Sequence, residues 1–203
     1  IAYLTKLIGA DYGVVISASH NSGEYNGIKV FNSEGYKLGD KEEERIERCF
    51  IHEKTNDFPD IGSYEQDLHL IKRYREFLLN AVEHSFAGKT IVLDGAFGAA
   101  HRIAPDVFRR AGASVIAANC VDDGLSINRN CGAVYPHNLA RKVLRYKADM
   151  GFAFDGDADR LIAVDEHGDV IDGDMILCAL AKYFDAQGKL PCRTAVGTSH
   201  TNM

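Results

Sequence analysis

The sequence predicts an α/β protein whose sheets are mainly parallel and flanked by helices. Short apolar runs rich in β-branched residues alternate with longer segments in which apolar residues recur every three or four positions. Such an alternation is typical of parallel strands joined by crossover helices. Apolar residues make up 46% of the 203 residues and charged residues 26%, a balance typical of a folded globular chain.

Strands and helices are expected along most of the chain. Strands are expected at Gly13–Ile16, Ile28–Phe31, Lys89–Asp94, Ser114–Ala118, Met150–Phe154, Leu161–Val164 and Arg193–Gly197. Helices are expected at residues 1–8, Asp40–Ile51, Tyr64–Glu83, Ala99–Ala111, His137–Tyr146 and Asp172–Phe184. Gly9 is a typical helix stop and Asp172 a typical N-cap. In the fifth helix, Leu139, Val143 and Leu144 are expected to face the core.

One segment has the composition of a linker. Thr55–Ser63 contains Asn, Asp, Pro and Gly without hydrophobic periodicity. We therefore expect one unit at residues 1–63, a second at 64–171 and the beginning of a third at 172–203.

Composition argues against several classes of partner and location. The net charge of −6 does not provide the basic surface that nucleic acid requires, so no nucleic-acid partner is expected. No apolar run approaches the roughly 20 residues of a membrane span, and no membrane partner is expected. The five cysteines are scattered without C-x-x-C spacing, which favours reduced thiols and a cytoplasmic location.

The first polar loop follows the strand expected at 13–16. It places the hydroxyl of Ser19 beside the imidazole of His20, among small residues, at the carboxyl end of a strand. Ligand groups gather at such strand ends in α/β sheets. A reactive serine and a plain polar turn both fit this composition. The G-x-S-x-G pattern of an acyl-transfer serine is absent, because Ser17 and Asn21 occupy the glycine positions.

The second polar loop holds three carboxylates between two expected strands. Asp155, Asp157 and Asp159 alternate with small residues, and carboxylates this close raise one another's pKa. A divalent cation such as Mg²⁺ or Ca²⁺ is the usual remedy. An EF-hand is excluded because its sixth position requires Gly and holds Arg160. A dehalogenase-type phosphatase is disfavoured because Asp159 stands where that pattern has Thr or Val.

Together the two loops indicate phosphoryl chemistry. A phosphoserine carries a charge of about −1.5 to −2 and three acceptor oxygens, which would complete the ligand shell of a cation held by three Asp residues. Phosphoryl transfer depends mainly on positioning and charge neutralisation. Arg160 could add a bidentate contact to the phosphate.

These motifs resemble those of the α-D-phosphohexomutase family. Ser17–Asn21 is similar to its S/T-A-S-H-N active-serine loop, and Asp155–Arg160 to its D-G-D-x-D-R metal loop. Asn26–Lys29 matches its N-G-x-K motif. Asp94–Ala100 resembles its D-x-A-N-G-A-A turn, with Phe97 in place of Asn. The resemblance extends over nearly the whole chain.

One further segment is similar to the subgroup that acts on glucosamine phosphates. Asp123–Asn128 and Cys131-Gly132 resemble its D-G-x-N-I-N and C-G motifs. The chain departs from that pattern at Ala133, Val134, Tyr135 and His137, where the subgroup has Ser, Thr, His and Glu. Ser22 also replaces the Pro that follows S-H-N.

The resemblance implies both architecture and chemistry. It implies phosphohexomutase-type mixed sheets in a fragment of a four-domain protein: the end of domain 1 with the phosphoserine loop, domain 2 with the metal loop, and the start of domain 3. It implies that Ser19 is phosphorylated and that Mg²⁺ binds Asp155, Asp157, Asp159 and the Ser19 phosphate. Arg160 would contact that phosphate, and His20 and Lys29 would act near the transferring group.

The implied reaction interconverts glucosamine 6-phosphate and glucosamine 1-phosphate through a sugar bisphosphate, in the cytoplasmic synthesis of amino-sugar and cell-wall precursors. The family's sugar-recognition and substrate-phosphate loops are absent, so we expect this chain alone to be inactive. A phosphomannomutase or phosphoglucomutase, a metal-dependent phosphatase and a non-catalytic α/β module remain alternatives. The oligomeric state stays open.

Overall fold

The computed structural model describes residues 1–52, 62–198 and 201. Contacts divide the chain into two compact units. The first comprises Ile1–Ser17 and Asn26–Ala81, and the second comprises Ala18–Tyr25 and Val82–Met203. The short segment Ala18–Tyr25, which contains Ser19, therefore packs with the second unit although its flanking strands belong to the first.

The first unit is built on a β-hairpin. Its elements are α1 (Ala2–Ile8), β1 (Tyr12–Ser17), β2 (Gly27–Asn32), α2 (Asp40–His52) and α3 (His69–Asn80). The strands pair antiparallel, and α1 ends at Gly9, whose φ of 66° lies in the left-handed region that glycine tolerates. The ring of Tyr3 on α1 stacks on Phe77 of α3 with centroids 4.0 Å apart.

The second unit contains a five-stranded sheet in the order β4-β3-β5-β6-β7. Its strands are β3 (Thr90–Asp94), β4 (Ser114–Ala118), β5 (Met150–Phe154), β6 (Leu161–Asp165) and β7 (Val170–Ile171). β3 pairs in parallel with β4 and β5, whereas β5, β6 and β7 pair antiparallel. The expected α/β class, with mixed sheets flanked by helices, is confirmed.

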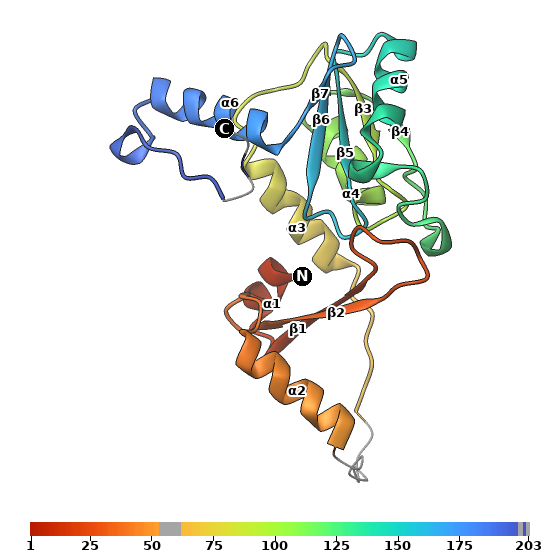
Figure 1. Cartoon of the computed structure of the whole chain (residues 1–203), viewed down its shortest axis with the longest axis vertical. Coiled ribbons are helices and arrows are strands. Elements are labelled where there is room, and N and C mark those ends of the chain that lie inside the picture. Colours follow the sequence, from red (N-terminus) through yellow and green to blue (C-terminus); the bar gives the residue numbers. More distant parts are fainter. Residues whose placement is uncertain (53–61, 199–200, 202–203) are drawn as a thin grey trace. The chain divides into compact units, whose positions relative to one another are not determined.

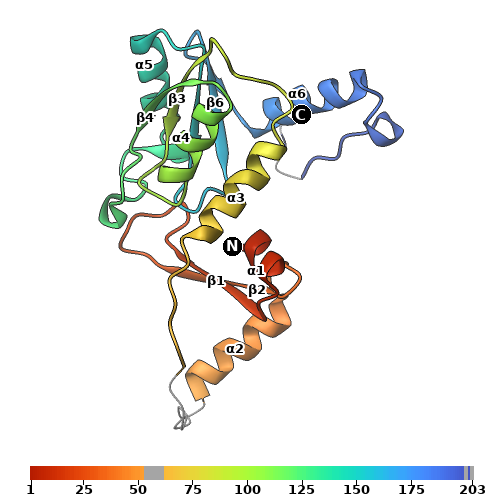
Figure 2. The same cartoon turned by 180° about the vertical axis from the view of Figure 1, so that it is seen from behind.

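Alternation along β3 builds a core on each face of this sheet. Ile91 and Leu93 pack with α4 (Ala100–Arg110), and Val92 packs with α5 (Pro136–Tyr146). All three are fully buried, because successive side chains of a strand point to opposite faces. Figure 1 shows α5 beside the sheet, and the reverse view in Figure 2 shows α4 in front of the sheet. The apolar core thus fixes the carboxyl ends of β3 and β5 side by side.

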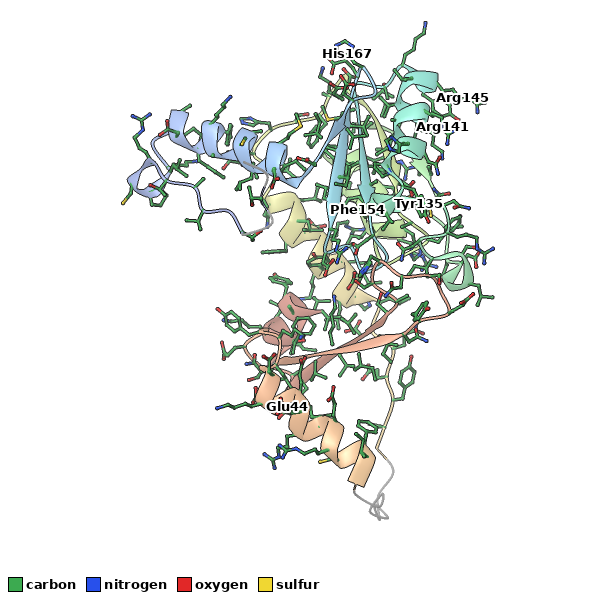
Figure 3. All side chains as sticks on the ribbon, viewed as in Figure 1. Glu44, Tyr135, Arg141, Arg145, Phe154 and His167 are labelled. Carbon is green, nitrogen blue, oxygen red and sulfur yellow. The ribbon has the colours of Figure 1, made fainter. Side chains whose placement is uncertain are left out.

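Helix α5 shows how the core face was partly misjudged from the sequence. Leu139 and Val143 are fully buried as expected, but Leu144 is 52% exposed, so its predicted inward orientation is wrong. Arg141 and Arg145 point away from the sheet in Figure 3. The helix buries Ala140 together with Leu139 and Val143, and Leu144 lies outside this buried stripe.

The C-terminal segment also differs from expectation. Helix α6 (Gly173–Ala186) begins as predicted at Asp172, whose carboxylate accepts from the N–H of Met175. Arg193–Gly197 was expected to be a strand, but Pro191–Arg193 form a 3₁₀ turn and the residues after it pair with no strand of the described chain. The guanidinium of Arg193 instead binds both carboxylate oxygens of Asp185 and holds the segment against α6.

Two smaller differences concern the start of one helix and an additional short strand. The helix expected from Tyr64 forms from His69, and the two-residue strand β7 was not expected. The predicted linker Thr55–Ser63 lies outside the described residues except for its last two positions. Among the described residues, no helix is both long enough and apolar enough to span a membrane.

The two leucines of α5 provide a matched test of this packing. Leu139→Ala should lower the free energy of unfolding by about 2–5 kcal/mol, because it opens a cavity in a closely packed cluster. Leu144→Ala should cost less than about 1 kcal/mol, because half of that side chain is already in water. Urea denaturation followed by circular dichroism measures both, and equal losses would contradict the assigned core face.

Candidate active site

The loop after β1 and the loop after β5 meet within the second unit. The backbone N–H of Gly156 donates to the carbonyl oxygen of Ser19 at 3.0 Å. A Cβ at position 156 would lie 2.4 Å from that oxygen, so only glycine allows this approach. Gly98, in the turn after β3, is equally restricted, because its Cβ would lie 2.2 Å from the carbonyl oxygen of Gly156. Three backbone segments are therefore packed against one another at this point.

The loop after β5 gathers the three predicted carboxylates. One oxygen from each of Asp155, Asp157 and Asp159 lies within 4.8 Å of the others. Asp155 is fully buried at the end of β5, and its Oδ1 accepts from the N–H of Arg160 at 3.0 Å. Its Oδ2 is buried and receives no hydrogen bond from the described residues.

Electrostatics in this group favours a bound cation. Burial raises the pKa of Asp155, and the negative charges of Asp159 and Asp157 raise it further. A buried carboxylate oxygen without a donor is costly unless a positive charge approaches it. Three convergent carboxylates are also the oxygen donors that hard divalent cations bind. The residues present therefore fit a metal ion, and the group could hold one.

Ser19 and His20 occupy the other loop. Ser19 is half-buried and its φ is 52°, a left-handed conformation that a non-glycine residue adopts only when its surroundings impose it. His20 is exposed and lines a pocket of about 460 Å³ together with Glu24 and Tyr135. In Figure 3, Tyr135 lies at the same end of the second unit as Phe154, the last residue of β5.

The structure gives less support to the other two predicted site residues, Arg160 and Lys29. The side chain of Arg160 is exposed, and its backbone N–H donates to Oδ1 of Asp155 in the acidic group. Lys29 lies half-buried on β2 in the first unit, opposite Val15. The structure thus brings the Ser19 loop and the three Asp residues together within one unit, and the roles of Arg160, His20 and Lys29 stay predictions.

Sequence reasoning gave no role to Asn128. Its backbone has a φ of 57°, its side chain is 6% exposed, and its amide nitrogen donates to the carbonyl oxygens of Ser19 and Asn21. The only available signal was its place at the end of the Asp123–Asn128 motif, since contacts across more than a hundred positions leave no periodic pattern in the sequence.

Two segments of the chain match models of one known protein family. Residues 1–57 match the family model of phosphoglucomutase/phosphomannomutase α/β/α domain I, and residues 72–168 match that of α/β/α domain II. Together the two models cover about three quarters of the chain. The fold and the site therefore place the chain in a class of proteins that contain these two α/β/α domains in succession. The chain belongs to the phosphoglucomutase/phosphomannomutase family, the α-D-phosphohexomutases.

Individual relatives agree with this assignment. The chain is 45% identical over 207 residues to the phosphoglucosamine mutase of Alkaliphilus oremlandii, and 46% identical over 208 residues to that of Clostridium beijerinckii. Both alignments cover all of this chain and 46% of the relative, so the chain spans about half the length of the curated relatives it matches.

Solved structures share the fold. A phosphoglucomutase/phosphomannomutase family protein from Burkholderia thailandensis superposes with a TM-score of 0.72 at 28% identity, over 88% of this chain and 38% of its own. A more distant neighbour, N-acetylphosphoglucosamine mutase of Aspergillus fumigatus with GlcNAc-6P and magnesium, has a TM-score of 0.53 at 19% identity, over 93% of this chain and 52% of its own.

The raised pKa of Asp155 predicts a stability that depends on pH. Without metal, the unfolded chain loses this proton near the ordinary value of 3.8 while the folded chain retains it to higher pH. The carboxyl group therefore destabilises the fold increasingly as the pH rises above 3.8. In the presence of a metal chelator at pH 7, the substitution Asp155→Asn should therefore raise the midpoint temperature of thermal unfolding.

The gain should shrink as the pH falls and disappear below 3.8, where the carboxyl group of the native sequence is protonated in both the folded and the unfolded state. Asp122→Asn serves as the control, because Asp122 is an exposed carboxylate in the same unit. A midpoint for Asp155→Asn at or below that of the native chain at pH 7 would contradict the assigned electrostatics.

Proposed function

We propose that this chain carries the phosphoserine and metal loops of a phosphoglucosamine mutase, which interconverts glucosamine 6-phosphate and glucosamine 1-phosphate. The observation that supports it is the contact between the Ser19 loop and the loop of three aspartates. The names of the relatives that are 45–46% identical support the choice of sugar. Phosphoglucomutase or phosphomannomutase is the runner-up, because the matching family models carry those names.

Each site residue has a proposed role. The Ser19 hydroxyl carries the phosphoryl group, and Asp155, Asp157 and Asp159 hold Mg²⁺ with the Ser19 phosphate as a further ligand. Mg²⁺ would neutralise charge on the phosphate oxygens. Arg160, whose side chain is exposed, contacts the same phosphate through its guanidinium. His20 and Lys29 act as acid, base or charge-stabilising groups near the transferring phosphoryl.

The proposed reaction uses two transfers in opposite directions. In the first, the bond from phosphorus to the Ser19 oxygen breaks and a bond to a sugar hydroxyl forms, while the hydroxyl proton passes to a base, for which His20 is the candidate. The resulting sugar bisphosphate then returns its other phosphoryl group to Ser19. The pocket of about 460 Å³ beside His20 provides space next to the serine loop.

The domain assignment belongs to the same proposal. Residues 1–63 would be the end of domain 1, 64–171 domain 2 and 172–203 the start of domain 3. An Aspergillus fumigatus neighbour of the same fold holds GlcNAc-6P and magnesium, which supports a phosphosugar ligand here. A second structure from that organism holds glucose 1,6-bisphosphate, which supports a bisphosphate intermediate. A cytoplasmic location follows from the metabolic role proposed.

Phosphorylation of Ser19 tests the proposal directly. The protein expressed from the complete reading frame that encodes this chain should gain one phosphoryl group from glucose 1,6-bisphosphate in the presence of Mg²⁺. Peptide mass spectrometry should place it on Ser19. Ser19→Ala should abolish the gain, and Ser114→Ala, which changes an exposed serine on β4, should retain it.

Two results would refute this role. One is a phosphate found repeatedly on another residue while Ser19 stays free. The other is net release of inorganic phosphate from the sugar without any phosphorylated protein, which would favour a phosphatase. A non-catalytic module would give neither phosphorylation nor release.

Metal binding gives a second test. Calorimetry should detect Mg²⁺ binding to the unphosphorylated protein, and Asp155→Ala should weaken it at least tenfold, because the buried oxygen of this ligand is lost. The Asp122→Asn variant should bind Mg²⁺ as tightly as the native chain does. Asp122 is exposed, and it lies far from the acidic loop in the sequence. Unchanged binding in Asp155→Ala would rule out the metal assignment.

A further inference from the structure

We infer that Asn128 is a positioning residue that holds Ser19 at the acidic loop, an inference that rests on the proposed function. Its side-chain nitrogen donates to the carbonyl oxygen of Ser19 at 2.6 Å and to that of Asn21 at 2.7 Å. The two hydrogens of one amide nitrogen can serve two acceptors, and no other side chain of this size has that geometry. Asn128 therefore bridges the residue before and the residue after His20.

Ser19 is held from two independent directions. Its carbonyl oxygen accepts one hydrogen bond from Asn128 and a second from the N–H of Gly156 in the acidic loop. A carbonyl oxygen has two lone pairs, so these donors occupy it fully. Together they account for the left-handed conformation of Ser19, which isolated backbone would not favour.

Asn128 is itself anchored to the sheet. Its backbone N–H donates to the carbonyl oxygen of Ala96 at 3.0 Å, and the N–H of Ala96 donates to Oδ1 of Asp94 at 3.0 Å. Asp94 is the last residue of β3 and is fully buried. The turn that holds Asn128 is thus fixed to the end of β3, while Gly156 follows the end of β5.

This arrangement fixes the serine relative to the carboxylates. β3 and β5 are neighbours in the sheet, so the two donors to Ser19 have a rigid separation. Asn128 and Gly156 then place the Ser19 backbone within reach of the Asp155 group before any ligand arrives. Because the side-chain amide of Asn128 donates to backbone oxygens of the serine loop, it acts on the hydroxyl through the loop and takes no part in bond breaking.

Two substitutions separate the side chain from the backbone. Asn128→Gly keeps the left-handed conformation accessible and removes both donors. Asn128→Asp keeps the shape and places carboxylate oxygens against two carbonyl oxygens. Lys147→Gly is the matched control, because Lys147 is an exposed residue of the same unit with a φ of 50° at the end of α5.

The experiment follows Ser19 phosphorylation by glucose 1,6-bisphosphate in the protein from the complete reading frame. Both Asn128 variants should lower the saturating rate about 10²-fold, the loss expected when a reacting group is misplaced by about 1 Å. In Asn128→Gly, the half-saturating bisphosphate concentration and the Mg²⁺ affinity should stay within about threefold of the native values, and the thermal midpoint within a few degrees. Hydrogen exchange should accelerate in peptides covering residues 18–25, and Lys147→Gly should change none of these.

Every outcome bears on the inference. A saturating rate within twofold of the native value in both variants would overturn it. It would also be overturned if Asn128→Gly lowered Mg²⁺ binding and global stability as much as it lowered the rate. If Asn128→Asp does not fold, Asn128→Gly decides. If the native protein is never phosphorylated, the proposed function fails, and unchanged exchange at 18–25 in Asn128→Gly would separately overturn the positioning role.

Discussion

The site depends on the close approach of three backbone segments at Gly156. Its N–H holds the carbonyl oxygen of Ser19, and its own carbonyl oxygen accepts from the N–H of Ala99 at 2.8 Å. The absence of a side chain at positions 98 and 156 makes this contact possible, since a Cβ at either would overlap the neighbouring backbone. The serine loop, the turn after β3 and the acidic loop are consequently one packed assembly, although they lie far apart in the sequence.

The grouping of carboxylates in the acidic loop favours cation binding but lowers the stability of the metal-free fold. Three carboxylates converge at the end of β5. Burial of Asp155 raises its pKa above the ordinary value, and repulsion from the other two carboxylates raises it further. Such an arrangement is characteristic of sites whose ligand supplies the missing positive charge. The rigid core of the second unit makes this tolerable, because Ile91, Val92 and Leu93 anchor the adjacent strand on both faces of the sheet.

The parallel half of the sheet explains where the chemistry gathers. Because β3 and β5 run in the same direction, Asp94 and Asp155 emerge at the same edge. There the acidic loop after β5 contacts both the turn after β3 and the serine loop. Family membership is in keeping with this geometry. Loops at the end of a parallel sheet can change while the strands that support them keep their packing.

Most helices and strands, the close grouping of the three aspartates and the family could be predicted from local sequence. Local periodicity and short motifs carry that information, because strand alternation, capping at Asp172 and the spacing of carboxylates are all local. Tertiary structure alone decided that Ala18–Tyr25 packs with the second unit, that Asn128 holds Ser19, that Leu144 faces solvent and that Arg193–Gly197 forms no strand. Each depends on contacts between distant residues, such as the 109 positions that separate Asn128 from Ser19, and local sequence does not record such contacts.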